Sequence, residues 1–396
     1  MNQTVTSPQL ADAGTEALPV AVAKAPARSA ARLNFLDNLK MILTVLVVAH
    51  HAGQPYGPTG GAWPMTHAVK ERMLGPFFHV NASFFMGLFF LISAYFLPAA
   101  FDRKGPAKFL ADRFLRLGVP LVAFVLIIFP ACEYVVQGHG RSFIAFVSDW
   151  LLTKHQFEFG HLWFVAHLLV YALGYALIRK LWRVYRAAVV SRPFPSNTAI
   201  LLYALALAAV CVVVRMWFPI DRWVFIGVPS EIAHLPQYFS LFVLGIVAYR
   251  YAWIDRVPVR TGRLWLAIGL LMAAARYSYT ALHQSFLSWP RHGFEWSSLV
   301  WNTWEAFLCV GMCIGLLYWS QVHWNGAPGA FRRFLNRNAY GVYLFHLPIL
   351  VGIQLSLEPT SFGPLTLTLL SALFTLAASY LLTAGLRLIP GVSRVL

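Results

Sequence analysis

The sequence predicts an all-α, polytopic integral membrane protein. Of its 396 residues, 59% are hydrophobic and only 12% are charged, which is far more apolar than a single soluble core requires. Apolar runs of roughly 20 residues, long enough to cross a bilayer, recur through most of the chain. Because a segment in lipid must satisfy its own backbone hydrogen bonds, we expect each run to form a helix.

About ten such runs are present. They cover approximately 38–56, 79–100, 117–136, 161–182, 197–218, 234–253, 263–282, 296–319, 338–357 and 364–387. An even number of spans places both termini on one side of the membrane. If that side is the cytoplasm, most of the 31 lysines and arginines lie in inner connections, as the positive-inside rule requires. We therefore expect both termini to be cytoplasmic.

Topology also explains the net charge of +16. The basic residues occupy short connections and form no single basic face, so we expect no nucleic-acid partner. The cysteines lie within apolar runs, where packing is a better interpretation than a disulfide or a metal site, and no metal is expected. The four cysteines are Cys132, Cys211, Cys309 and Cys313.

Residues 1–32 are expected to form a flexible, uncleaved tail. They are rich in Ala, Pro, Thr and Ser, and their apolar stretch from Leu18 to Ala23 is too short for a signal peptide. The longest connections, 57–78 and 137–160, are too short for an additional domain. Residues 33–396 are therefore expected to form a single transmembrane domain that holds the whole function.

The first span carries two ionisable side chains on one face. Lys40 and His51 are eleven positions apart, which is about 20° short of three helical turns and about 16 Å of rise. The two side chains should point the same way at different depths. This stripe suits a ligand that is anionic beside Lys40 and reacts beside His51. Asp37 is placed to pair with Lys40, although Lys40 also suits a simple snorkelling anchor.

His51 is the predicted general base, because a neutral imidazole can accept a hydroxyl proton near pH 7. His50 is about 100° away around the helix and is the alternative base. His79, His161 and His346 also lie at or inside span ends. Each one alone is explained by an interfacial hydrogen bond, but ionisable groups gathered at membrane depth favour a functional site.

Glu305 lies mid-depth in a predicted span. A lone carboxylate there should be neutral or paired with a cation, and Arg276 is one possible partner. A structural pair and a catalytic role are both open for Glu305.

Five segments, in order along residues 33–387, resemble motifs of the acyltransferase type 3 family of bacterial membrane proteins. The first is Leu-Asp-Asn-Leu-Lys at residues 36–40, followed by His51. The others are Phe89–Phe96, Phe109–Pro120, His161–Phe164 and Ala339–His346. Two positions depart from the family pattern: Lys40 replaces the usual Arg, which removes a fork-shaped contact, and Ala94 replaces a Gly.

The resemblance implies an O-acyltransferase of the bacterial inner membrane, closest to the single-domain branch that includes glucan succinyltransferases. Such an enzyme moves an acetyl or succinyl group from acyl-CoA to a hydroxyl of a periplasmic or cell-surface carbohydrate. Acyl-CoA would be the donor substrate, with no permanently bound cofactor. The implied partners are acyl-CoA, the carbohydrate acceptor and membrane lipid.

We expect Arg113 and Arg116 to hold the donor nucleotide on the cytoplasmic side, with solvated positive-inside charge as the alternative interpretation. His79, His161, His346 and Glu305 are expected to contact either substrate. A multispan transporter or exporter of an acylated or sugar substrate is the chief rival function, because buried His, Arg and Glu also suit proton coupling. A scaffold component of the envelope would share the topology without needing the Lys40–His51 stripe.

Overall fold

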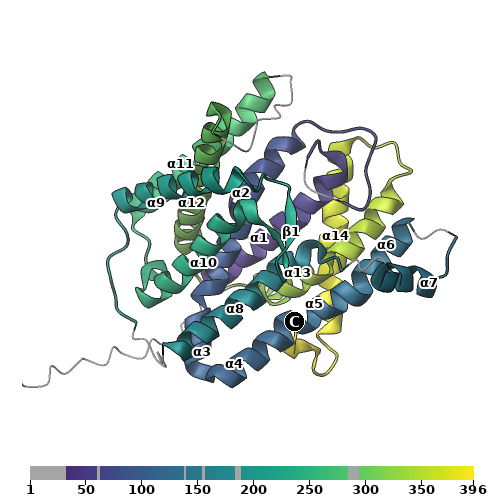
Figure 1. Cartoon of the computed structure of the whole chain (residues 1–396), viewed down its shortest axis with the longest axis horizontal. Helices are drawn as coiled ribbons and strands as arrows, with labels where there is room; N and C mark the ends of the chain where they lie inside the picture. The colour runs from purple at the N-terminus through teal and green to yellow at the C-terminus, as the bar shows by residue number, and fades with distance from the viewer. Residues whose placement is uncertain (1–32, 60–62, 138–139, 154–156, 183–188, 284–293) are drawn as a thin grey trace, which may run out of the picture. The chain divides into compact units, whose positions relative to one another are not determined.

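A computed structural model of the chain describes residues 33–59, 63–137, 140–153, 157–182, 189–283 and 294–396. The predicted tail, residues 1–32, lies outside the described residues. The described chain is almost entirely helical (Figure 1).

Nine long helices form most of the described chain. They are α1 (Asn34–Gly53), α2 (Leu74–Tyr95), α8 (Trp163–Leu181), α9 (Asn197–Arg215), α10 (Leu235–Arg250), α11 (Val259–Leu282), α12 (Trp296–Trp324), α13 (Ala330–Leu357) and α14 (Pro364–Leu386). The shorter helices are α3 (Leu97–Lys104), α4 (Pro106–Arg113), α5 (Val119–Ala123), α6 (Phe129–Gln137) and α7 (Phe143–Ser148). π-Helical turns at Phe114–Gly118 and Phe124–Ile128 join α4, α5 and α6 into one continuous segment.

Within the described residues, nine helical segments are long and apolar enough to cross a membrane. The all-α polytopic fold class is therefore confirmed. The predicted span 263–282 corresponds to α11, which contains Arg260, Arg263 and Arg276. It is long enough to cross a membrane but is not one of these nine apolar segments, which include Pro106–Gln137 instead. The α11 helix packs along α12.

The helix that contains the predicted third span begins before that span. It was expected from residue 117, but the apolar helical segment runs over Pro106–Gln137. Arg113 and Arg116 therefore lie in its first turns and not in a connection. Pro106 explains the start, because proline is favoured at the first helical position.

A short hairpin was not predicted. Strand β1 (Trp223–Phe225) pairs antiparallel with β2 (Pro229–Glu231), and Trp223 lies opposite Glu231. Gly227 has φ +85° in the turn, a conformation that glycine adopts without a steric penalty. The hairpin lies between α9 and α10 in the chain (Figure 1).

The α1 helix contacts α2, α12, α13 and α14. Its buried Leu36, Leu39, Leu43 and Val47 recur at helical spacing on one face. Other helices approach closely at glycines, since a Cβ on Gly311 of α12 would lie 2.6 Å from the backbone nitrogen of Gly269 in α11. Small residues of this kind allow membrane helices to pack backbone to backbone.

Candidate active site

Three histidines from separate parts of the chain meet at one place. His51 is in the last turn of α1, His161 precedes α8, and His346 is in α13. His51 Nδ1 lies 2.8 Å from His346 Nε2, and the rings of His161 and His346 are 4.4 Å apart between centroids. His161 and His346 are buried, whereas His51 is partly exposed. His51 is therefore the most accessible member of this histidine cluster.

The hydrogen bonds of the cluster fix one arrangement of protons for neutral rings. His346 Nδ1 lies 2.8 Å from the Tyr343 carbonyl oxygen, which can only accept, so this nitrogen carries the proton. His346 Nε2 is then an acceptor, and His51 Nδ1 must donate to it. This leaves the lone pair on His51 Nε2, the arrangement that a general base requires.

The Tyr343 carbonyl lies within hydrogen-bond distance of two rings. It also accepts from His161 Nε2 at 2.8 Å, and the Tyr343 hydroxyl donates to the His161 carbonyl at 2.5 Å. Pro348 lies inside α13 and cannot donate to the carbonyl of Leu344, which loosens the helix at this point. The two buried imidazoles are thus held by backbone oxygens of α13 and by each other.

Trp63 covers part of the His51 ring. The indole and the imidazole are 5.5 Å apart between centroids with 30° between their planes. Trp63 Nε1 donates to Gln354 at 2.8 Å, and Gln354 donates to the carbonyl of Ala52 at 3.2 Å. The connection after α1 therefore contributes a fixed aromatic wall to the site, which was not predicted.

His50 faces a different environment. Its ring packs against Phe78 at 5.0 Å and Phe85 at 5.2 Å between centroids. His50 Nδ1 is buried without a hydrogen-bond partner among the described residues. Of the two adjacent histidines, only His51 has its Nδ1 oriented by another ring nitrogen.

The predicted Asp37–Lys40 pair is present at the other end of α1. Lys40 Nζ lies 2.9 Å from Asp37 Oδ1 and 4.9 Å from the centre of the Phe96 ring. The two cavities described below are lined by neither Lys40 nor His51. A common cavity for these two residues therefore stays a prediction.

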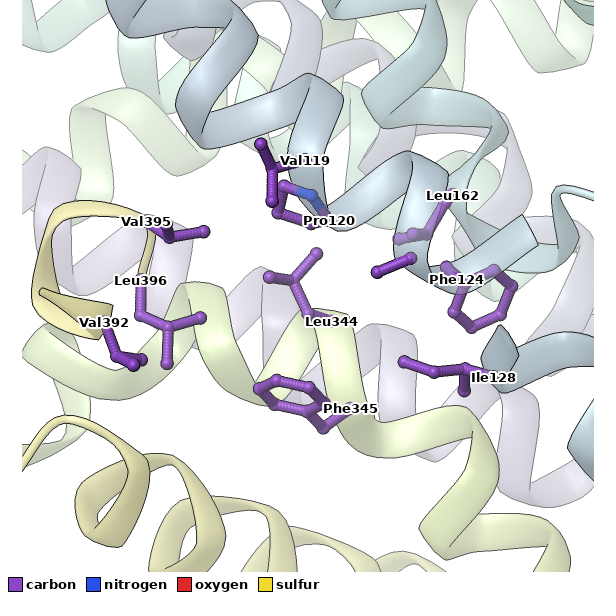
Figure 2. A pocket seen from close by; sticks show the side chains of 11 residues that line it. Val119, Pro120, Phe124, Ile128, Leu162, Leu344, Phe345, Val392, Val395 and Leu396 are labelled. Carbon is purple, nitrogen blue, oxygen red and sulfur yellow. The ribbon is translucent and has the colours of Figure 1, made fainter. Parts of the chain in front are cut away.

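An apolar cavity of about 230 Å³ lies between the basic start of the third span and α13. Figure 2 shows Leu344 and Phe345 of α13 between Phe124 and Leu162 on one side and Val392, Val395 and Leu396 on the other. The Phe124 ring packs edge-on against His161 at 5.0 Å between centroids. The cavity therefore adjoins the histidine cluster.

Arg116 is connected to the same part of α13. Its carbonyl oxygen accepts a hydrogen bond from the Tyr340 hydroxyl at 2.5 Å. Three residues later, Val119 lines the cavity. Arg113 lies 3.4 Å from Asp112 and 5.3 Å from the centre of the Phe109 ring. Arg116 thus precedes the cavity-lining Val119 by about one helical turn, and neither arginine side chain lines the cavity itself.

Glu305 belongs to a separate ionic network, and its predicted partner is wrong. Glu305 forms an ion pair with Arg215 of α9 and lies 3.1 Å from His234 Nε2. His234 Nδ1 is 2.9 Å from Glu231 of β2, and Arg215 also donates to Asn302 at 2.7 Å. Arg215 was available to sequence reasoning, because it is an ionisable residue in an apolar run.

Glu231 joins the hairpin to this network. Its Oε1 accepts from the backbone amide of Asp221 at 2.7 Å. Burial acts to raise the pKa of Glu231, but His234 and the Asp221 amide outweigh burial and hold the pKa below its ordinary range. The ionised carboxylate is thus stabilised where the hairpin meets α10.

Arg276 is near His79 instead. Arg276 Nη2 lies 2.9 Å from His79 Nδ1, and Arg276 also donates to Thr280 at 2.7 Å. His79 thus contacts Arg276, and Glu305 contacts Arg215 and His234. Of the predicted substrate-contacting residues, the structure brings His161 and His346 to His51, and it places His79 and Glu305 elsewhere.

Within the described residues, no three His, Cys, Asp or Glu side chains are arranged to hold a metal ion. The four cysteines are buried and unbridged. The chemistry that the described residues of the cluster support is acid–base chemistry at the imidazoles.

A family model described as an acyltransferase domain matches residues 33–384. The chain belongs to the acyltransferase type 3 family. Together with the apolar helices, this match makes the protein a multi-pass membrane acyltransferase. Comparison with curated proteins and with solved structures found no match.

Proposed function

We propose that this membrane acyltransferase moves an acetyl or succinyl group from acyl-CoA to a hydroxyl of a periplasmic or cell-surface carbohydrate, with His51 as the general base. The observation that carries the proposal is the chain of contacts from the Tyr343 carbonyl through His346 to His51. This chain leaves a lone pair on Nε2 of the partly exposed His51. Buried partners that orient a reachable imidazole are the usual support of a catalytic base.

In the proposed reaction, His51 Nε2 accepts the proton of the acceptor hydroxyl. The hydroxyl oxygen bonds to the thioester carbonyl carbon, the carbon–sulfur bond breaks, and the proton passes to the CoA sulfur. The products are the acyl ester and free CoA. His346 acts as a positioning residue because it touches His51 and no reacting atom.

The donor is proposed to approach from the cytoplasmic side. Arg113 and Arg116 would meet its anionic nucleotide. The apolar cavity that begins at Val119 leads to Phe124, which contacts His161, and its lining suits the acyl-bearing arm of the donor. Lys40, at the same end of α1 as Asp37, would supply a further cation.

This route requires a particular topology. We propose ten spans, with α11 added to the nine apolar segments and its buried Arg276 held beside His79 inside the bundle, and with both termini in the cytoplasm. The bacterial inner membrane fits this arrangement, because acyl-CoA is available on one side and envelope carbohydrate on the other. A glucan is the proposed acceptor.

Replacing His51 and His50 separately tests the base. We expect purified His51→Ala to release free CoA thiol from acyl-CoA at least about 10²-fold more slowly than the unmodified protein, since general-base catalysis is worth about that much. The matched control, His50→Ala, should retain most of the activity. Equal loss in both variants, with equal amounts of folded protein, would refute the assignment.

The same assay separates an enzyme from a transporter. A transporter would move substrate across vesicle membranes without acceptor-dependent release of CoA thiol. Mass spectrometry of the envelope glycans, with and without the protein, would then identify the acyl group and the acceptor.

A further inference from the structure

A second apolar cavity, of about 290 Å³, lies on the side of the bundle formed by α9 and α10. Its floor includes Leu91 of α2 and Val310 of α12. Neither the histidine cluster nor the basic start of the third span contributes to it. The proposed acyl transfer does not use this cavity.

In the proposed topology, the cavity is a groove on the lipid-facing side of the bundle. Ala199 of α9 and Leu244 of α10 line it. Both helices also present exposed apolar side chains beside it, including Leu202 on α9 and Val243 on α10. A hydrogen bond of 2.8 Å between Tyr203 and Ser240 joins α9 to α10 at one end. A hydrocarbon chain from the membrane can therefore enter without crossing a polar surface.

The other end of the groove carries a hydrogen-bond donor without a partner. Phe194 and Trp253 line this end, with their rings 6.5 Å apart between centroids. Trp253 Nε1 is shielded from water and has no hydrogen-bond partner among the described residues. A buried donor left unpaired is costly, so this nitrogen suits a ligand that brings an acceptor oxygen.

A cation is fixed beside the same end. Arg192 is exposed, and its guanidinium lies 4.6 Å from the centre of the Tyr251 ring. Its backbone amide donates to the Tyr251 carbonyl at 3.2 Å. This anchors the segment before α9 to the end of α10, next to Trp253. In the proposed topology this is the cytoplasmic interface, where tryptophan and arginine meet lipid headgroups.

We propose that the groove binds one acyl chain of an anionic glycerophospholipid. The chain would fill the space between α9 and α10, its ester carbonyl would accept a hydrogen bond from Trp253 Nε1, and its phosphate would lie against Arg192. A volume near 300 Å³ is at the lower end of ligand pockets, which suits a hydrocarbon chain better than a headgroup. The site is separate from the proposed active site.

Native mass spectrometry of the full-length purified protein tests the proposal, with dioleoylphosphatidylglycerol or dioleoylphosphatidylcholine added to the detergent. We expect one retained lipid per chain and a preference for the anionic lipid. Arg192→Gln should weaken binding of the anionic lipid about fivefold, the effect of one interfacial cation. Arg337→Gln, at an exposed arginine of α13, is the matched control and should change nothing.

A second pair of variants tests the groove itself. Leu244→Trp places a large side chain in the groove and should abolish retention of the lipid. Leu205→Trp adds the same side chain on the exposed face of α9 and should leave retention unchanged. If Leu244→Trp does not fold, Ala199→Leu at the rim replaces it. Retention as in the unmodified protein by a folded groove variant, or equal retention of the two lipids, would overturn the proposal.

Discussion

In the proposed mechanism, His51 depends on contacts made by residues that do not meet the substrate. His346 Nε2 accepts a hydrogen bond from His51 Nδ1, and the Tyr343 carbonyl sets the orientation of His346. A base held in the wrong tautomer presents an N–H to the substrate in place of a lone pair. The orientation of His51, the proposed base, is thus set by α13, almost three hundred positions later in the chain.

Replacing His346 should reveal this dependence. We expect His346→Leu to lower kcat on the order of 10²-fold while the KM for acyl-CoA changes little, because the donor does not touch His346. His346→Gln, whose amide oxygen can accept from His51, should recover part of kcat. Steady-state kinetics over a range of pH would measure both effects.

His323 provides the control for that experiment. It is exposed, and its Nδ1 contacts the Trp319 carbonyl at 2.8 Å. His323→Leu should leave kcat unchanged. If His346→Leu behaved like His323→Leu, the positioning role would have to be abandoned.

At the scale of single residues, sequence predicts which side chains are unusual but not which ones meet. His51, His161 and His346 were found because an imidazole at membrane depth is costly. The same rule finds His79 and Glu305, which the structure places in other networks. Which side chains meet depends on which helices pack together. The contact of Glu305 with Arg215 of α9, for example, cannot be derived from spacing within α12. Trp63 gave no signal, because a tryptophan in a connection is common.

At the scale of elements, hydropathy locates helices well and their ends poorly. The helix of the third span starts at Pro106 and not at residue 117. Basic residues in its first turns lower the local hydropathy without ending the helix. The hairpin at residues 223–231 was missed because two strands of three residues carry too little alternation to be recognised. Both differences change where charged residues lie, namely Arg113 and Arg116 in the helix of the third span and Glu231 in the hairpin. The site predictions that needed correction also concerned charged residues.

The close approach of α11 and α12 leads to a stability prediction. Gly311→Ala should lower stability by about 1–3 kcal/mol, because the new methyl group would meet the backbone of Gly269. The matched control is Gly352→Ala in α13, where a Cβ meets nothing within 4 Å. It should be neutral or slightly stabilising. Thermal unfolding in detergent compares the two, and equal shifts would contradict the close contact.

The hairpin gives a prediction about pH. Because the folded-state pKa of Glu231 is below its ordinary range, ionisation of Glu231 stabilises the fold above the ordinary glutamate pKa of about 4.3, and this contribution is lost as the pH falls through the folded value. At pH 7, Glu231→Gln should therefore cost about 1–3 kcal/mol. The difference in melting temperature between the two proteins should shrink at acidic pH. A difference independent of pH would show that Glu231 acts by packing alone.

At the scale of the whole molecule, the proposed reaction joins two aqueous compartments. Along the segment that includes the apolar cavity, Arg113 and Arg116 come before Val119, and Phe124, which contacts His161, comes after it. Sealed vesicles test this arrangement. Inverted membrane vesicles loaded with acceptor should release CoA thiol when acyl-CoA is added outside, because the cytoplasmic face is then exposed to the donor.

Right-side-out vesicles provide the contrast. They should release CoA thiol only after a detergent admits the donor to the lumen. Equal release from both kinds of intact vesicle would mean that the donor binds on the outer face, and Arg113 and Arg116 would lose their proposed role.

The aromatic wall formed by Trp63 has a consequence for the proposed transfer, namely which hydroxyl of the sugar acceptor is acylated. A sugar offers several hydroxyls of nearly equal acidity, so acidity alone gives a mixture of esters. The His51 ring is held in place by His346 and lies beside the fixed indole of Trp63. If the flat C–H face of the sugar rests on that indole, His51 Nε2 can receive the proton of only one hydroxyl. The expected product is therefore a single positional isomer, chosen by how the sugar lies against the tryptophan.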